Sequence, residues 1–173
     1  MIKAIVYTTN TGSTAQYAEM LGKMVQLPVF SIFDAERKLE SQTEIIYLGW
    51  VMASQIKGYD RAAKRFSVKA VGAVGMAATG SYGQSVREKN HIPAGIPVFI
   101  LQGNFQVGKL HGLYRLMMEI MIKSVGKTLG SKENRTAEED DMLDMMLHGG
   151  NRVSEQNLRA FERWVIRQRG DRV

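Results

Sequence analysis

The chain of 173 residues contains no cysteine. This absence excludes a disulfide scaffold, a thiolate nucleophile, a cysteine-ligated zinc site and an iron–sulfur cluster. Proline is scarce as well, with three residues, which argues against a disordered linker. Any redox chemistry of this protein would therefore depend on a bound organic cofactor rather than on a side-chain sulfur.

Long apolar runs are also missing. The longest runs, such as residues 45–53, fall far short of the roughly 18–20 residues that cross a bilayer, and no basic and apolar leader opens the chain. The composition, 45% hydrophobic and 23% charged, is ordinary for a globular protein, and the length suits one domain with a full core. We therefore expect residues 1–173 to form a single cytoplasmic domain.

The charge is basic and uneven. Lysine and arginine number 23 against 17 aspartate and glutamate residues, which gives a formal net charge of +6. Residues 131–145 hold two basic and six acidic side chains, whereas residues 152–173 hold six basic and three acidic ones. This balance favours an anionic membrane surface or a carboxylate-bearing substrate as partner. We expect no nucleic-acid partner.

Apolar segments of strand length alternate with helical patterns in the first hundred residues. Five predicted strands span residues 2–7, 27–33, 44–49, 70–78 and 96–102. Tyr17, Ala18, Leu21 and Met24 recur at helical spacing between the first two, and residues 60–66 predict a short helix. In the third strand, residues 45–48 are apolar on successive positions, so both of its faces must be covered. The pattern predicts a doubly wound α/β domain with a five-stranded parallel sheet and helices on both faces.

The pattern changes after residue 103. Residues 110–125 and 137–147 predict two further helices, with a polar loop between them, and a last helix starts at Ser154. In a minimal domain of this class the fifth strand would lead directly into one final helix. Residues 104–150 are therefore interpreted as a helical insert after strand five.

A run of small polar residues follows the first strand and opens the first helix. Its hydroxyl, amide and glycine residues, from Thr9 to Thr14, lie where four helix N–H groups have no partner within the helix. Together with the positive end of the helix dipole, this loop is a candidate phosphate site. The alternative is an ordinary serine- and threonine-rich turn that caps the helix.

This loop resembles the phosphate loop of the flavodoxins, which reads T-x-T-G-x-T. Thr9, Thr11, Gly12 and Thr14 match its fixed positions. The resemblance implies that the chain binds flavin mononucleotide (FMN), with the phosphate held by Thr9, Asn10, Thr11, Gly12, Ser13 and Thr14. It also implies that the isoalloxazine ring lies near the ends of the third and fourth strands.

Two loops at those strand ends are the candidates for the ring. Each combines aromatic residues with glycines, and Trp50, Tyr59 and Tyr82 could flank a planar ring by offset stacking. The alternative for Trp50 is that it simply ends a buried strand. The candidate ring residues are Trp50, Val51, Met52, Ala53, Ser54, Ile56, Lys57 and Gly58 in the first loop, and Thr79, Gly80, Ser81, Tyr82 and Gly83 in the second.

The second half of the chain is similar to one branch of that family, the menaquinone-dependent protoporphyrinogen dehydrogenases. Gly103 and Asn104, the aromatic, basic and methionine-rich segment 109–118 and the polar loop from Gly126 carry the resemblance. In that branch the FMN oxidises protoporphyrinogen and passes electrons to a quinone at the membrane. The chain departs from the branch in the acidic helix 138–144 and in the length of its C-terminal extension.

Six of the eleven methionines lie within the insert, at positions 117, 118, 121, 142, 145 and 146. Methionine suits adaptable binding surfaces, and Lys109, Arg115, Lys123 and Lys127 lie on or beside the first insert helix, so this helix could lie on anionic lipid. Alternatively, the methionines pack the insert against the sheet or a second copy in a homodimer, and we favour packing.

The sequence thus predicts an FMN-binding redox protein, either an electron carrier or an FMN-dependent oxidoreductase. Its partner would be a redox protein or a small molecule such as a quinone or porphyrinogen. A flavin-binding regulatory module without turnover is the alternative of another class. The three histidines have no metal-ligand spacing, so no metal site is expected.

Overall fold

The computed structural model describes residues 1–76, 78–104 and 112–170 of the chain. Its centre is a parallel sheet of β1 (Ala4–Thr8), β2 (Val29–Ser31), β3 (Glu44–Met52), β5 (Ser67–Gly75) and β6 (Val98–Gln102). The strands lie in the order β2-β1-β3-β5-β6, and the two-residue strand β4 (Gln55–Ile56) pairs antiparallel with the end of β3. With β4 set aside, this is the flavodoxin-like strand order 2-1-3-4-5, and the predicted fold class is confirmed.

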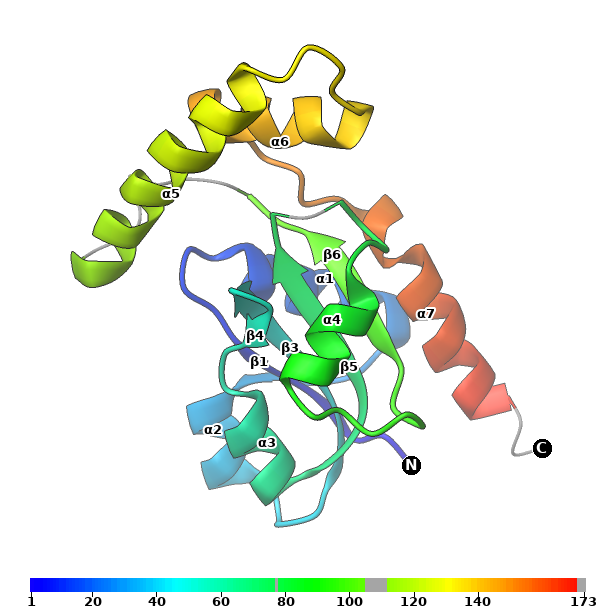
Figure 1. Cartoon of the computed structure of the whole chain (residues 1–173). Coiled ribbons are helices and arrows are strands. Elements are labelled where there is room, and N and C mark those ends of the chain that lie inside the picture. The colour runs from blue at the N-terminus through cyan, green and yellow to red at the C-terminus, as the bar shows by residue number, and fades with distance from the viewer. Residues whose placement is uncertain (77, 105–111, 171–173) are drawn as a thin grey trace.

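Helices cover both faces of the sheet (Figure 1). On one face, α1 (Ser13–Val25) and α7 (Glu155–Gly170) bury apolar side chains such as Tyr17 and Phe161. On the other, α2 (Ile32–Lys38), α3 (Tyr59–Arg65) and α4 (Gly83–Lys89) complete a second core. Residues 45–48 of β3 are fully buried, and they alternate between the two cores. The apolar run in β3 is therefore continuous because helices cover both faces of the strand, as predicted.

Three short elements depart from the sequence prediction. The predicted strand 27–33 is only Val29–Ser31, because the Ser31 hydroxyl accepts a hydrogen bond from the Asp34 amide (3.2 Å) and starts α2 there. The pattern also missed β4 and did not single out α4. The helices α2 and α4 have seven residues each and β4 has two, which is too few for a periodic signal to stand out in the sequence.

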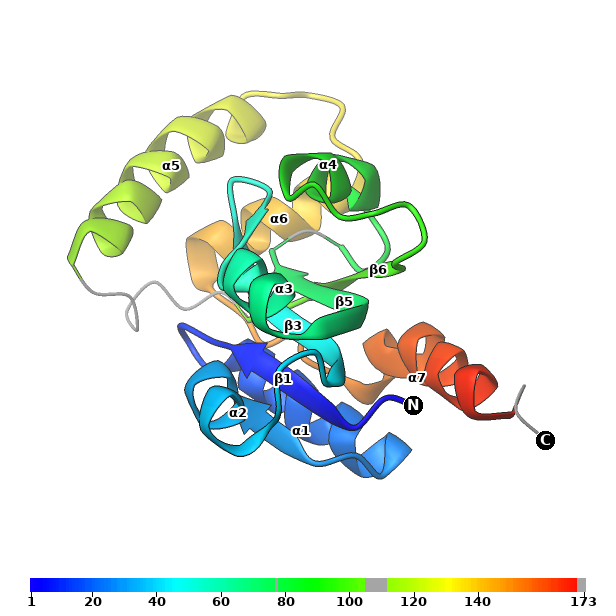
Figure 2. The ribbon, with the colours of Figure 1, turned by 90° about the horizontal axis from the view of Figure 1, so that it is seen from below.

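Two helices follow β6, as predicted, and stand over the carboxyl ends of the strands (Figures 1 and 2). These are α5 (Gly112–Gly130), which runs beyond the predicted end at residue 125, and α6 (Ala137–His148). Thr136 caps α6 in a reciprocal capping box with Glu139. We refer to α5, α6 and the turn between them as the helical hairpin. The start of the predicted helix 110–125 lies outside the described residues.

Candidate functional site

A cavity of about 540 Å³ opens at the carboxyl ends of the parallel strands, under the helical hairpin. Four groups of residues line it: the turn after β1, the end of β3 with the turn that follows, the ends of β5 and β6, and α4 with α5. In a doubly wound sheet, ligands bind at this edge, where the chain order reverses. The lining residues are Asn10, Thr11, Ser13, Thr14, Trp50, Val51, Met52, Ala53, Ser54, Ala73, Val74, Gly75, Met76, Tyr82, Val86, Ile100, Gly103, Asn104, Met117, Met118 and Met121.

The turn between β1 and α1 forms the polar end of the cavity. The amide of Gly12 donates to the Thr9 hydroxyl (3.1 Å), which closes the turn. Gly12 has φ of +100°, a conformation that favours glycine, and no side chain caps α1. The first-turn amides of this 13-residue helix therefore point toward the cavity end without a capping side chain. Of the six residues predicted for the phosphate, Asn10, Thr11, Ser13 and Thr14 line the cavity, whereas Thr9 and Gly12 shape the turn.

Positive charge does not accompany these hydroxyl groups. Among the described residues that line the cavity, none is lysine or arginine. Any anion in this turn would therefore be held by hydroxyl and amide donors and by the helix dipole.

The turn between β3 and β4 forms one wall of the cavity. Residues 50–54 all line it, and Ala53 and Ser54 have φ of 48° and 61°. Two successive left-handed residues are what a two-residue type I′ connection requires, although asparagine and glycine are preferred there. The turn thus holds an unfavourable backbone conformation at the cavity wall.

A buried tyrosine fixes the base of this turn. The Tyr47 hydroxyl shares a hydrogen bond with the Thr8 hydroxyl (2.8 Å) and donates to the Lys57 carbonyl (2.7 Å). Burial raises the pKa of Tyr47, so the phenol stays protonated and can donate. A Cβ on Gly58 would lie 2.3 Å from the Tyr47 hydroxyl oxygen. Of the predicted ring residues, Ile56, Lys57 and Gly58 therefore support the wall and do not line it.

Asn90, at the C-terminal end of α4, holds the same turn from the other side. Its Oδ1 accepts from the Ile56 amide (2.8 Å), and its Nδ2 donates to the Ser54 carbonyl (2.7 Å) and to the Val86 carbonyl (2.7 Å). The Asn90 side chain is buried, so losing these bonds would leave unsatisfied polar groups in the core. The position of the β3–β4 turn is therefore set by tertiary contacts from β1 and α4.

The second predicted ring loop contributes one residue to the cavity, Tyr82. Tyr82 is 64% exposed and stands at the rim with a left-handed φ of 52°, at the start of α4. The others make local contacts: Thr79 accepts from the Gln102 amide (3.1 Å), and Ser81 donates to the Ala78 carbonyl (2.6 Å). Thr79, Gly80, Ser81 and Gly83 are thus not among the residues that line the cavity.

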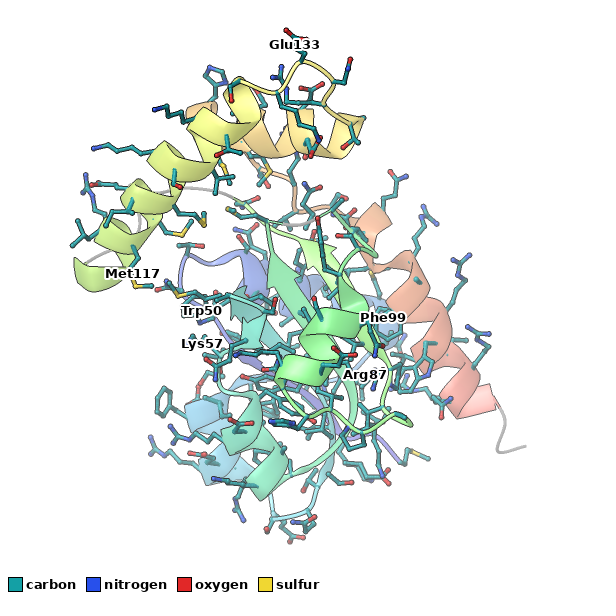
Figure 3. The ribbon with its side chains drawn as sticks, in the orientation of Figure 1. Trp50, Lys57, Arg87, Phe99, Met117 and Glu133 are labelled. Carbon is teal, nitrogen blue, oxygen red and sulfur yellow. The ribbon has the colours of Figure 1, made fainter. Side chains whose placement is uncertain are left out.

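Sequence reasoning missed the wall that α5 provides. Met117, Met118 and Met121 of α5 line the cavity together with Trp50 at the end of β3, and Figure 3 labels Met117 and Trp50. The methionine-rich composition was the available signal, but it does not say which methionines face the sheet. Met145 and Met146 are buried and pack with Met118 and Met121 of α5, so these methionines join the two helices of the insert to each other.

Gly103 and Asn104 connect the cavity to the rest of the fold. A Cβ on Gly103 would lie 3.0 Å from Val74 and 3.3 Å from Ser13, so glycine lets β6 end close to the polar turn. The Asn104 amide donates to the Ser13 hydroxyl (3.0 Å), and the Asn104 Oδ1 accepts from the Arg152 amide (3.0 Å). In the sequence these two residues carry part of the family resemblance, but their place at the cavity follows only from the fold.

Two negative findings concern the described part of the chain. No three histidine, aspartate or glutamate side chains within it come together as a metal site would require. None of its helices combines the length and the apolar character that crossing a bilayer demands.

No protein-family model and no curated protein matches this chain. Among solved structures it is similar to a “putative flavoprotein” from Bacteroides eggerthii, with 11% sequence identity and a TM-score of 0.40. The similarity covers 71% of this chain and 96% of that one. A match at this level carries no argument about the ligand. The flavodoxin-like fold stands on the strand order itself.

Proposed function

We propose that the chain binds FMN in the cavity and cycles it between oxidised and reduced states, as an electron-transfer protein or an FMN-dependent oxidoreductase. One observation carries this proposal. A single cavity has an uncapped helix N-terminus with hydroxyl groups at one end and turns bearing Trp50 and Tyr82 at the other. FMN has the matching parts, a phosphate at one end and a flat aromatic ring system at the other.

The polar end suits a phosphate monoester. Ser13 and Thr14 are buried at the start of α1, and the Ser13 hydroxyl accepts from Asn104, which leaves its own proton free to donate. Thr11 adds a third hydroxyl at the cavity wall, beside those of Ser13 and Thr14. Amides at the positive end of a helix dipole complete a site of the kind that binds phosphate groups in many proteins.

The apolar end suits a flat ring. Trp50 and Tyr82 offer aromatic faces, and Val51, Val74 and Met118 offer an apolar lining. When bound, the flavin would supply one- and two-electron chemistry, while the protein orients it and excludes water. We do not assign a side-chain acid or base, because among the described residues that line the cavity the Tyr82 phenol is the one ionisable side chain.

The test is flavin binding with and without the phosphate. The protein is incubated with FMN or with riboflavin, freed of excess ligand and examined at about 450 nm, where oxidised flavins absorb. We expect FMN to remain bound and riboflavin, which lacks the phosphate, to bind about 100-fold more weakly, because hydrogen bonds to a charged group contribute about 1.5–3 kcal/mol each. A colourless protein would refute the proposal, and equal affinities would refute the phosphate site.

Thr11→Ala tests one contact in that site. It should weaken FMN about tenfold and leave riboflavin unchanged, since it removes one donor to the phosphate. Thr43→Ala is the matched control, because Thr43 donates to the Glu40 carbonyl (2.8 Å) and does not line the cavity. An equal effect of both substitutions on FMN would remove Thr11 from the site.

A second candidate places the same cofactor at a membrane. It is the dehydrogenase activity implied by the family resemblance, in which a porphyrinogen reduces the flavin and a quinone reoxidises it. The observation that favours it is the outer face of α5, where Leu116 and Ile120 are 54% and 60% exposed and Lys123 and Lys127 are exposed beside them. Exposed apolar and basic side chains on one helix are typical of helices that lie in the interface of anionic membranes.

Vesicle binding tests the membrane part. We expect binding to anionic vesicles at low salt, weaker binding at high salt, and loss of binding in Leu116→Asp with Ile120→Asp. Ile166→Asp is the matched control, because Ile166 on α7 is also 54% exposed. Self-association of the wild type that the α5 substitutions abolish would instead identify this face as a homodimer contact.

Anaerobic redox titration tests the chemistry. Bleaching of the bound flavin by a porphyrinogen and its return with a quinone would support the dehydrogenase. Reduction by protein donors alone would support an electron carrier. If the bound flavin exchanges electrons with none of these reagents, the result would support the alternative that the protein is a regulatory module without turnover.

A further inference from the structure

The charged groups of the helical hairpin pair mostly with one another. Lys132 contacts Glu139 (2.7 Å) and Arg135 contacts Asp140 (2.6 Å), and both pairs lie within the hairpin or its turn. These exposed pairs fix the hairpin internally but do not attach it to the sheet. Asp141, the next residue of α6, differs because its partners lie outside the hairpin, and Asp144 makes a longer contact with one of them, Arg152 (3.4 Å).

Both oxygens of Asp141 are used. Its Oδ1 accepts from Arg152 Nη2 (2.8 Å) and Nε (3.1 Å), and its Oδ2 accepts from Gln102 Nε2 (2.7 Å). Burial disfavours the charged carboxylate, but the hydrogen bonds from Arg152 and Gln102 outweigh it, so the pKa of Asp141 lies below its usual value. The group is therefore ionised at neutral pH and accepts from three donors.

The two partners of Asp141 are themselves fixed to the body of the domain. Gln102 is the last residue of β6, and its carbonyl accepts from the Tyr17 hydroxyl of α1 (2.5 Å). The Arg152 amide donates to Asn104 Oδ1 (3.0 Å), and the Arg152 carbonyl accepts from Asn157 Nδ2 of α7 (2.9 Å). Asp141 thus joins the hairpin to the sheet, to α1 and to α7 through two anchored residues.

This attachment lies close to the methionine wall. Met145, one helical turn beyond Asp141, is buried together with Met146 and packs with Met118 and Met121 of α5. Met118 and Met121 line the cavity. Weaker contacts add to this attachment: Asp144 Oδ2 lies 3.4 Å from Arg152 Nη2, Gln102 Nε2 lies 3.7 Å from Met145 Sδ, and Met76 packs against the buried methionines. Since a thioether surface is adaptable, packing alone specifies the position of the wall weakly.

We propose that Asp141 is a positioning residue, which through Arg152 and Gln102 holds the methionine wall of the helical hairpin over the cavity. The consequence for function rests on the proposed flavin site: the wall would retain the cofactor and shield its ring from water. An amide replaces the carboxylate poorly, because it loses the negative charge that pairs with Arg152, and its –NH₂ can bond to Gln102 only after the Gln102 amide turns over.

The experiment compares Asp141→Asn with Asp140→Asn. The two residues are adjacent on α6, but Asp140 pairs only within the hairpin and its turn. In the protein without ligand, we expect amide hydrogen exchange in α5 and α6 to become about tenfold faster in Asp141→Asn and to stay unchanged in Asp140→Asn. In the protein with FMN, we expect the flavin to leave several-fold faster, followed as the rise of free-flavin fluorescence on dilution.

Arg152→Lys is the second variant, for the case that Asp141→Asn does not fold. Lysine keeps the charge but cannot give both Nε and Nη2 to one oxygen, so it should change exchange in the same helices to a smaller extent. Equal exchange in Asp141→Asn and Asp140→Asn would overturn the proposal, as would an increase spread equally over β1 and β3. Failure of the wild type to bind flavin would refute the proposed function. The hydrogen-exchange result without ligand would still test whether Asp141 positions the helical hairpin.

Discussion

Gly58 is the position where the structure makes the most demanding quantitative prediction. Its φ is +82°, and a Cβ there would lie 2.3 Å from the Tyr47 hydroxyl oxygen and 2.6 Å from the Thr8 hydroxyl oxygen. In Gly58→Ala the left-handed conformation of the alanine costs about 1–2 kcal/mol. The stiffer unfolded chain offsets a smaller part of that cost. The Tyr47 ring must also move and lose its bond to the Lys57 carbonyl, which costs a further 1–3 kcal/mol, roughly, for a buried group.

The expected loss in the free energy of unfolding is therefore about 3 kcal/mol for Gly58→Ala. Gly80→Ala is the matched control, because Gly80 has φ of +88° but nothing lies within 4 Å of its added Cβ. That substitution should cost only about 1 kcal/mol. Urea denaturation followed by circular dichroism measures both. If the two variants lost the same stability, the Tyr47 contact would not hold the β3–β4 turn as described.

Three further predictions concern the same fold. Ser54→Gly should raise the free energy of unfolding by about 0.5–1 kcal/mol, because it relieves a left-handed residue in the type I′ connection; lower thermal stability would contradict this. Asn90→Ala should cost about 3 kcal/mol by urea denaturation and release the β3–β4 turn, since it removes the side-chain bonds to the Ile56 amide and to the Ser54 carbonyl. The N-terminal amine and Lys69 lower the pKa of Glu44 to about 2, below its value in the unfolded chain. The stability from Glu44 is thus present above about pH 5 and lost as pH falls toward 2, so Glu44→Gln should cost about 1 kcal/mol, allowing for solvent screening, at pH 7 and almost nothing at pH 2.

The sequence predicted those parts of the fold that local pattern determines. The apolar run in β3 implied a sheet covered on both faces, and the turn from Thr9 to Thr14 lies at one end of the cavity, where its residue types placed it. The fold predictions succeeded because the burial of a strand and the position of a strand–helix turn are properties of neighbouring residues.

The rest depends on contacts between distant segments. The pattern placed Ile56 and Gly58 in the wall itself, whereas contacts with Tyr47 and Asn90 make these residues its support. Composition marked the insert as methionine-rich, but which methionines face the sheet is decided by how α5 packs on α6. Neither relation leaves a periodic trace in the sequence, since the partners lie tens of residues apart.

The hydrogen bond between Asn104 and Arg152 also bears on how such a domain could evolve. It brings Asn104, where the chain leaves the flavodoxin-like body, next to Arg152, where the chain returns to it, so the excursion between them has adjoining ends. A segment with adjoining ends can be gained, lost or exchanged without altering the order of the strands or the path into α7. Such an exchange would keep the strand ends and the polar turn of the cavity, and it would replace the wall that Met117, Met118 and Met121 provide.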